Sequence, residues 1–201
     1  SHRSARDLGV AGFLADVARN QAFLLPRLLG QTPRYFRFPF LERGNTPEER
    51  VQITKELSRQ GYTVANVSID FADWAFVEAY ARCSQRGDQA ALRALGESYL
   101  QNASAALFWS VEAGQRLFGR TIPQVLLLHA HVPTAQNLDA LLTRYEEQGV
   151  RWIGLGEALR DPVFAEPPEL DHGDTTILAE AIGRSHADLR KQIRQGIART
   201  L

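Results

Sequence analysis

Methionine is absent from the 201 residues of this sequence, and cysteine occurs once, at Cys83. Because the initiator methionine is also missing, we expect a chain that was processed or that is part of a longer protein. A single cysteine excludes a disulfide bond within the chain, which is compatible with both the cytosol and the periplasm. Cys83 follows a helical pattern, and we interpret it as a small apolar packing residue.

An excess of charge of either sign is lacking too, since 23 basic residues balance 23 acidic ones. A neutral chain gives no reason to expect binding to nucleic acid or to an anionic membrane surface. No apolar run approaches the roughly eighteen residues of a membrane-spanning helix, and no signal-peptide pattern is present. The 44% hydrophobic and 23% charged residues are ordinary for a globular domain, and they exclude disorder or a coiled coil as a description of the whole.

Helical and extended patterns alternate along the chain, which favours an α/β fold with parallel strands. Each predicted helix has a recognisable end, such as the Thr46-Pro47 start or the Gly119 stop. Predicted helices cover residues 5–29, 46–60, 70–82 (after a loop), 89–118, 133–148 and 175–201. Predicted strands cover residues 34–40, 62–69, 124–129 and 150–154.

Polar and aromatic side chains gather where three of the predicted strands end. Arg37 closes the first of these strands, Asp73 and Trp74 follow the second, and His129 ends the third. In parallel α/β proteins the carboxyl ends of the strands carry the functional groups. An aspartate that orients a histidine, with an arginine nearby, is a plausible acid–base set. Asp70 is better interpreted as the cap of the following helix than as a catalytic group.

Three segments at these strand ends resemble motifs of the polysaccharide deacetylases, carbohydrate esterase family four with its NodB homology domain. They are Arg37-Phe38-Pro39-Phe40, Asp70-Phe71-Ala72-Asp73-Trp74 and Leu126-Leu127-Leu128-His129. The resemblance implies a distorted parallel (β/α) barrel that lacks its first strand or strands. It covers residues 1–162 as a partial deacetylase domain, and residues 163–201 are then an acidic linker followed by a C-terminal helix.

Two earlier motifs of the family are incomplete in this chain. The Thr-Phe-Asp-Asp motif, with its catalytic base and metal-binding aspartate, is not found. Ser1-His2 resembles the end of the family's His-Ser/Thr-x-x-His motif, which implies that His2 binds a divalent metal ion and that its other ligands precede residue 1. Zinc is the expected ion, although an Asp-His-His set would also accept cobalt or others. The alternative for His2 is an ordinary terminal residue.

The resemblance also implies catalytic roles for three residues. His129 would protonate the departing amine as the general acid, and Asp73 would hold its imidazole and raise its pKa. Arg37 would pair with the missing base. The alternative for Arg37 is a surface cation at a strand end, and His131, two residues beyond His129, is better explained by solvent or loop contacts.

A second set of residues would bind the substrate. Trp74 and Leu127 would form an apolar wall for the acetyl methyl group, and such a small pocket favours acetyl over longer acyl groups. The backbone N–H of Phe40, in the turn that Pro39 opens, would stabilise the tetrahedral oxyanion together with the metal. The alternative for Trp74 is a place in the core.

The expected function is therefore metal-dependent removal of acetyl groups, N-acetyl before O-acetyl, from a polysaccharide or peptidoglycan-type glycan. The expected partner is an acetylated glycan, without nucleic acid or a membrane span, and the family favours the periplasm or secretion over the cytoplasm. With His2 as its one metal ligand, the isolated chain should be nearly inactive. The alternative is a non-catalytic carbohydrate-binding or assembly module derived from the same barrel. The sequence leaves the identity of the glycan and the oligomeric state open.

Overall fold

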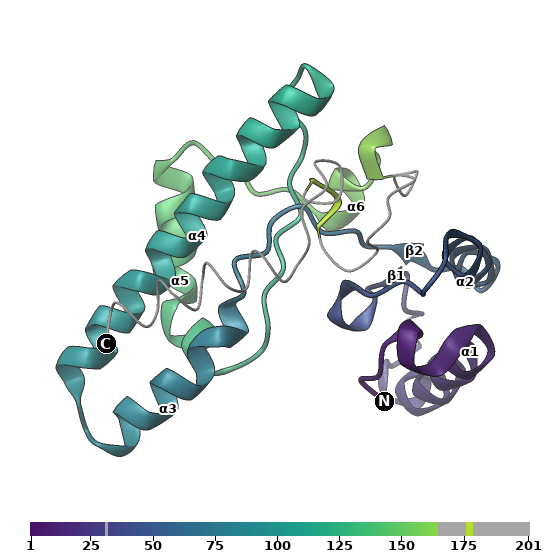
Figure 1. Cartoon of the computed structure of the whole chain (residues 1–201), viewed down its shortest axis with the longest axis horizontal. Helices are drawn as coiled ribbons and strands as arrows, with labels where there is room; N and C mark the ends of the chain where they lie inside the picture. The colour runs from purple at the N-terminus through teal and green to yellow at the C-terminus, as the bar shows by residue number, and fades with distance from the viewer. Residues whose placement is uncertain (31, 165–175, 179–201) are drawn as a thin grey trace. The chain divides into compact units, whose positions relative to one another are not determined.

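The computed structural model describes residues 1–30, 32–164 and 176–178, and most of them are helical (Figure 1). The chain divides into two compact units, each described here by itself. Unit 1 contains residues 1–66 and 176–178 of the described chain, and unit 2 contains residues 67–164. Within the described chain, every helix is too short or too polar to cross a lipid bilayer.

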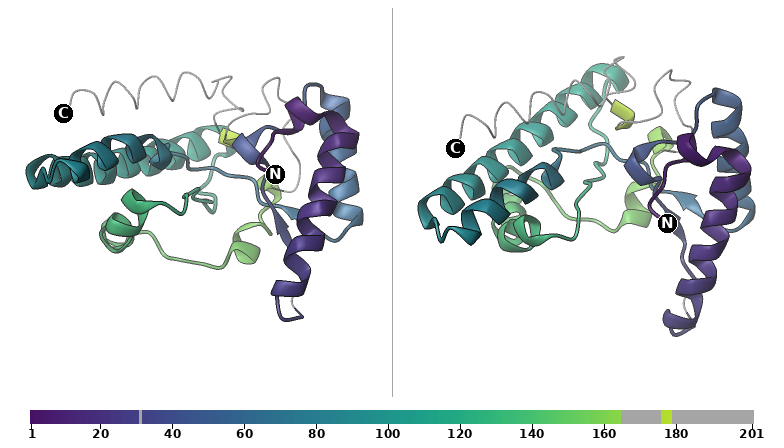
Figure 2. Two further views of the ribbon diagram at one scale, coloured as in Figure 1. Left: turned by 90° about the horizontal axis from the view of Figure 1, so that it is seen from below. Right: turned by 60° about the horizontal axis from the view of Figure 1, so that its bottom comes forward.

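Unit 1 packs two helices against a short parallel sheet. Helix α1 (Ala5–Leu24) begins where the Ser4 hydroxyl accepts the Asp7 N–H, and the short 3-10 helix η1 (Leu25–Arg27) follows it. Strands β1 (Tyr35–Phe36) and β2 (Thr63–Val64) run parallel, and α2 (Pro47–Arg59) connects them. Helices α1 and α2 lie side by side (Figure 2). Aromatic rings of α1 and of the segment that begins at β1 pack together in the core of this unit, with Phe13 stacked on Phe38 at 5.6 Å.

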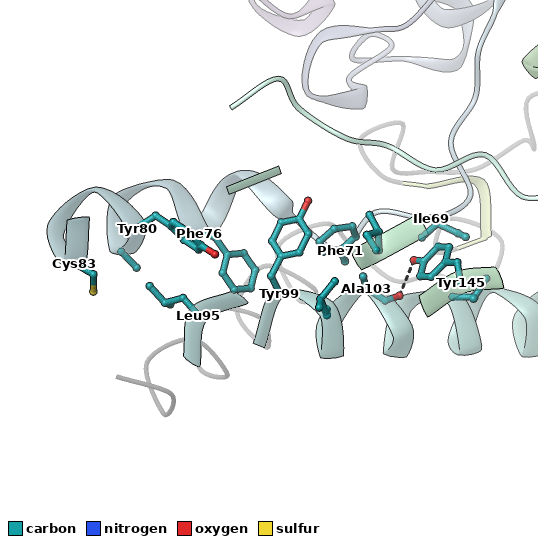
Figure 3. Packing of buried hydrophobic residues seen from close by; sticks show 13 residues of the cluster. Ile69, Phe71, Phe76, Tyr80, Cys83, Leu95, Tyr99, Ala103 and Tyr145 are labelled. Atoms are coloured by element: carbon teal, nitrogen blue, oxygen red, sulfur yellow. Dashed lines mark hydrogen bonds between the residues drawn. The ribbon is translucent and has the colours of Figure 1, made fainter. Parts of the chain in front are cut away.

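Unit 2 is dominated by α4 (Gln89–Phe118), whose 30 residues span about 45 Å. Helices α3 (Val77–Gln85) and α5 (Val132–Glu147) pack against α4. The short helices η3 (Asp73–Phe76), α6 (Leu155–Ala158) and η4 (Pro162–Phe164) complete the unit. The core lies along α4, where Tyr99 is fully buried between Phe71 and Phe76 (Figure 3). Tyr145 of α5 donates its hydroxyl hydrogen to the Ala103 carbonyl at 2.8 Å.

The predicted (β/α) barrel is wrong. Among the described residues, sheet structure is limited to β1, β2 and one isolated parallel bridge between Ile69 and Leu126. The segments at 124–129 and 150–154, predicted as strands, form none. The predicted strands at 34–40 and 62–69 shrink to two residues each.

The hydrogen bonds of residues 125–129 explain why this apolar run does not become a strand. The Leu127 N–H donates to the Ile69 carbonyl at 2.9 Å, as a parallel ladder requires. The N–H groups on either side donate to side chains instead. The Val125 N–H donates to the Ser68 hydroxyl, and the His129 N–H donates to the Asp73 carboxylate. Side-chain acceptors thus take the place of a neighbouring strand. The apolar run that predicted a strand reflects the burial of these residues and not strand formation.

The helix ends agree well with the sequence patterns. Helix α4 has the predicted bounds, and Gly119 ends it in the left-handed conformation at φ 66°. Thr46 caps α2 by accepting the Glu49 N–H. Asp70 does not cap a helix, because its carboxylate accepts the Ala72 N–H at 2.7 Å in a turn before η3. The predicted linker after residue 162 and the predicted helix 175–201 lie almost entirely outside the described residues.

The buried face of α4 should carry most of the stability of unit 2. Leu95 is fully buried on this helix, whereas Leu117, on the same helix, is 37% exposed. Replacing Leu95 with alanine should lower the free energy of unfolding by about 2–5 kcal/mol, because a core cavity remains. The matched Leu117→Ala change should cost about 1 kcal/mol at most. Urea unfolding followed by far-ultraviolet circular dichroism measures both, and equal losses would contradict this core.

Candidate functional site

Two chain segments that the Ile69–Leu126 bridge joins supply the candidate site in unit 2. The first segment continues from Ile69 to Asp73, the first residue of η3. The second continues from Leu126 through His129 to His131, which caps the N-terminus of α5. The parallel pairing therefore brings an aspartate and two histidines together at the same end of the bridge.

Asp73 and His129 form a tight hydrogen-bonded pair. Oδ1 of Asp73 lies 2.6 Å from Nδ1 of His129, and Oδ2 accepts the His129 backbone N–H at 2.7 Å. The Trp74 backbone N–H donates to Oδ1 as well, at 2.9 Å. The Asp73 side chain is fully buried, whereas that of His129 is 40% exposed. A buried carboxylate thus fixes both the backbone and the ring of a solvent-accessible histidine.

A buried hydroxyl pair completes the surroundings of this carboxylate. The Thr134 hydroxyl donates to Oδ2 of Asp73 at 2.9 Å, and the Tyr99 hydroxyl lies 3.0 Å from the Thr134 oxygen. Burial raises the pKa of Tyr99 to about 12, which keeps its hydroxyl protonated. Helices α4 and α5 therefore both contribute to holding Asp73 in place.

The charge of Asp73 depends on these donors. Burial by itself would raise the pKa of the Asp73 carboxyl, but the hydrogen bonds from His129 and Thr134 outweigh burial and leave that pKa below its ordinary value. Asp73 is consequently ionised at neutral pH. An ionised carboxylate against Nδ1 fixes the ring so that Nδ1 carries hydrogen and Nε2 is the nitrogen that exchanges protons.

His131 lies on the other side of the same carboxylate. Its Nε2 atom is buried, has no hydrogen-bond partner among the described residues, and lies 3.6 Å from Oδ2 of Asp73. Its Nδ1 atom is 3.2 Å from the Thr134 hydroxyl oxygen. The rings of His129 and His131 lie nearly parallel, with centroids 6.1 Å apart. Burial lowers the pKa of His131, and the charge of Asp73 compensates only in part.

Asp73, His129 and His131 could together hold a metal ion, since one ligand atom from each lies within 4.8 Å of the others. In the described part of the chain, this is the one group of at least three potential ligands, and His2 does not belong to it. Our interpretation of the sequence did not include His131 in the site. The signal that could have found it is the His-x-His spacing directly after a buried apolar run.

The remaining predicted site residues fall into both units. Trp74 and Leu127 belong to unit 2, where Trp74 is half-buried and Leu127 is buried. His2, Arg37, Pro39 and Phe40 belong to unit 1. There the His2 ring meets the exposed Phe40 ring edge-on at 4.6 Å. Arg37 Nε donates to the Ala65 carbonyl at 3.4 Å.

Two of the three motif-bearing segments contain a residue in the left-handed conformation, and Leu41, which follows the first segment, shares it. Phe40 and Leu41 have φ angles of 57° and 60°, and Ala72, directly before Asp73, has a φ angle of 53°. A side chain other than glycine in this region costs on the order of 1–3 kcal/mol, and such strain is concentrated at functional sites. The backbone is thus strained next to Asp73 and at the residue expected to face the oxyanion.

No family model, curated protein or solved structure matches this chain. The site therefore has to be interpreted from its own geometry and chemistry.

The partly buried position of His131 predicts a pH dependence of stability. Because its pKa is lowered from 6.5, the unfolded chain takes up this proton at a higher pH than the folded chain does. The free energy of unfolding should therefore fall as the pH decreases from about 6.5. His131→Asn removes the group but keeps a good helix cap, so its stability should fall less between about pH 7 and pH 5. Urea unfolding in the presence of a chelator tests this, and parallel curves would contradict it.

Proposed function

We propose that this chain carries the general-acid half of the active site of a deacetylase that removes acetyl groups from glycans. The observation that carries the proposal is the Asp73–His129 pair, with its 2.6 Å contact between the carboxylate and Nδ1. The resemblance of three segments to polysaccharide deacetylase motifs supports it, because Asp73 and His129 occupy the positions of the acid pair in two of them. N-acetyl groups are the preferred substrate, with O-acetyl groups second.

His129 would supply the proton that makes an amide hydrolysable. In the reaction a water oxygen bonds to the acetyl carbon, the bond from that carbon to the sugar nitrogen breaks, and acetate and an amine result. The amine is a poor leaving group until its nitrogen gains a proton, which Nε2 of His129 would donate. Asp73 would keep the imidazolium oriented and favour its charged form before transfer. The partial exposure of His129 is compatible with access by a polymeric substrate.

The other predicted roles extend this proposal. Trp74 follows Asp73 directly in the sequence, and Leu127 lies two residues before His129. Both side chains would contact the acetyl methyl group. The backbone N–H of Phe40 would stabilise the oxyanion, in a turn whose left-handed geometry is already strained. Arg37 would orient the catalytic base that the family uses. In this proposal Pro39 shapes that turn by fixing its own φ angle at the first position of the 3-10 helix Pro39–Leu41.

In the described chain, His2 does not form the metal site that the resemblance implies. His2 is exposed, and no second and third ligand join it there. A divalent ion such as zinc would polarise the acetyl oxygen and activate water in enzymes of this kind, but no step of the mechanism above is assigned to it. We therefore propose further ligands outside this sequence for the predicted site and little hydrolysis by residues 1–201 alone.

Replacing His129 with glutamine should abolish proton donation while keeping a polar side chain of similar size. Acetate release from an acetylated chito-oligosaccharide, catalysed by the whole reading frame that includes residues 1–201, should fall in kcat by about 10²–10⁴-fold. KM should change little, because the acid acts in the transition state.

Asp73→Asn should lower kcat too and shift the alkaline limb of the pH–rate profile to lower pH, because the neutral amide no longer favours the imidazolium.

The matched control is His172→Gln, since His172 lies outside the segments that carry the resemblance. It should retain the acetate release of the unchanged protein. Undiminished kcat in His129→Gln would contradict the proposal, as would the absence of acetate release from the whole reading frame with zinc present. Glycan binding without any acetate release would instead favour the non-catalytic carbohydrate-binding module.

A further inference from the structure

We infer that Asp73, His129 and His131 form a binding site for a divalent transition-metal ion, built by unit 2 alone and distinct from the metal position expected at His2. All of its ligands come from residues 73–131 of the described chain. The consequence for activity rests on the proposed function: an ion in this site would occupy the general acid and act as an inhibitor.

Two of the ligand atoms already have the spacing that such an ion requires. Ligands of tetrahedral zinc lie about 2.0–2.2 Å from the metal, so two of them are about 3.4 Å apart. The distance of 3.6 Å between Nε2 of His131 and Oδ2 of Asp73 agrees with that spacing. The three ligand atoms lie within 4.8 Å of one another, and the fourth position of a tetrahedron would remain for water. The His129 ring then gives up its short hydrogen bond to Asp73 and binds the ion instead.

The surroundings of His131 supply the partner that a metal-bound histidine needs. A histidine that binds a metal through one nitrogen donates a hydrogen bond from the other to a nearby oxygen. Here Nδ1 of His131 lies 3.2 Å from the Thr134 hydroxyl oxygen, whose own hydrogen bonds to Asp73. With the ion on Nε2, the ring proton lies on Nδ1 and faces the Thr134 hydroxyl oxygen, in place of the 3.4 Å hydrogen bond that Nδ1 accepts from the Thr134 backbone N–H. The buried Nε2 atom, which lacks a hydrogen-bond partner in the described chain, gains one ligand bond.

The donor set selects the class of ion. Two imidazole nitrogens and one carboxylate oxygen suit zinc, cobalt or nickel, whereas magnesium and calcium prefer oxygen ligands alone. A metal ion binds an unprotonated ring nitrogen, so an ion in this site holds both imidazoles in the neutral form, and a proton from an imidazolium leaves to solvent. His129 therefore cannot bind the ion and act as the acid at the same time. The hydrogen-bonded and metal-bound forms of the site are mutually exclusive.

Zinc titration of metal-free residues 1–201 by isothermal calorimetry tests the site without substrate. The expected result is one zinc ion per chain, and cobalt in its place should give the intense visible absorption of a tetrahedral ion. His131→Asn removes a ligand but preserves the cap of α5, and circular dichroism checks that it folds. This variant should bind zinc at least about tenfold more weakly. His2→Ala, the matched control, should bind as the unchanged chain does.

Each alternative result overturns the inference. Unchanged zinc affinity in His131→Asn would do so, as would loss of binding in His2→Ala or no binding by the unchanged chain. Because binding is measured without substrate, a failure of the deacetylase proposal leaves this result intact. If both proposals hold, excess zinc should suppress acetate release by the whole reading frame, and His131→Asn should weaken that suppression.

Discussion

Burial of the Asp73 carboxylate is the constraint on which the rest of the site depends. A fully buried charge is costly unless hydrogen bonds replace the water it has lost. Backbone N–H groups of Trp74 and His129 and the Thr134 hydroxyl provide them. These donors come from η3, from the segment before α5 and from α5 itself, so removing the carboxylate would leave three elements without their common acceptor. The left-handed turn at Ala72 positions the carboxylate where all of them meet.

This single carboxylate can serve two chemistries. In the proposed deacetylase it would stabilise the His129 imidazolium through Nδ1, as a general acid requires. With an ion between itself and two imidazoles it becomes a metal ligand. The same Thr134 hydroxyl supports both forms, since it donates to Asp73 and lies within hydrogen-bond distance of His131. The two proposals above describe two forms of one site, and in that account the metal supply would determine which form prevails.

The sequence predicted the helices better than it predicted the sheet. Local signals determine where α2 and α4 begin or end, and Thr46 and Gly119 act within one turn. Strand formation depends on a partner far along the chain, and in residues 125–129 the side chains of Ser68 and Asp73 took that partner's place. The pairing of Asp73 with His129 was still predicted, because the parallel bridge survives. His131 was missed, since its place beside Asp73 depends on the turn that begins α5.

The most direct test of this account is the nuclear magnetic resonance signal of the His129 Nδ1 proton in the metal-free chain. A proton held at 2.6 Å between imidazole and a buried carboxylate should resonate far downfield and exchange slowly with water. The signal should disappear in Asp73→Asn and persist in His2→Ala. Its absence from the unchanged, folded chain, or its persistence in Asp73→Asn, would contradict the central role of the buried carboxylate.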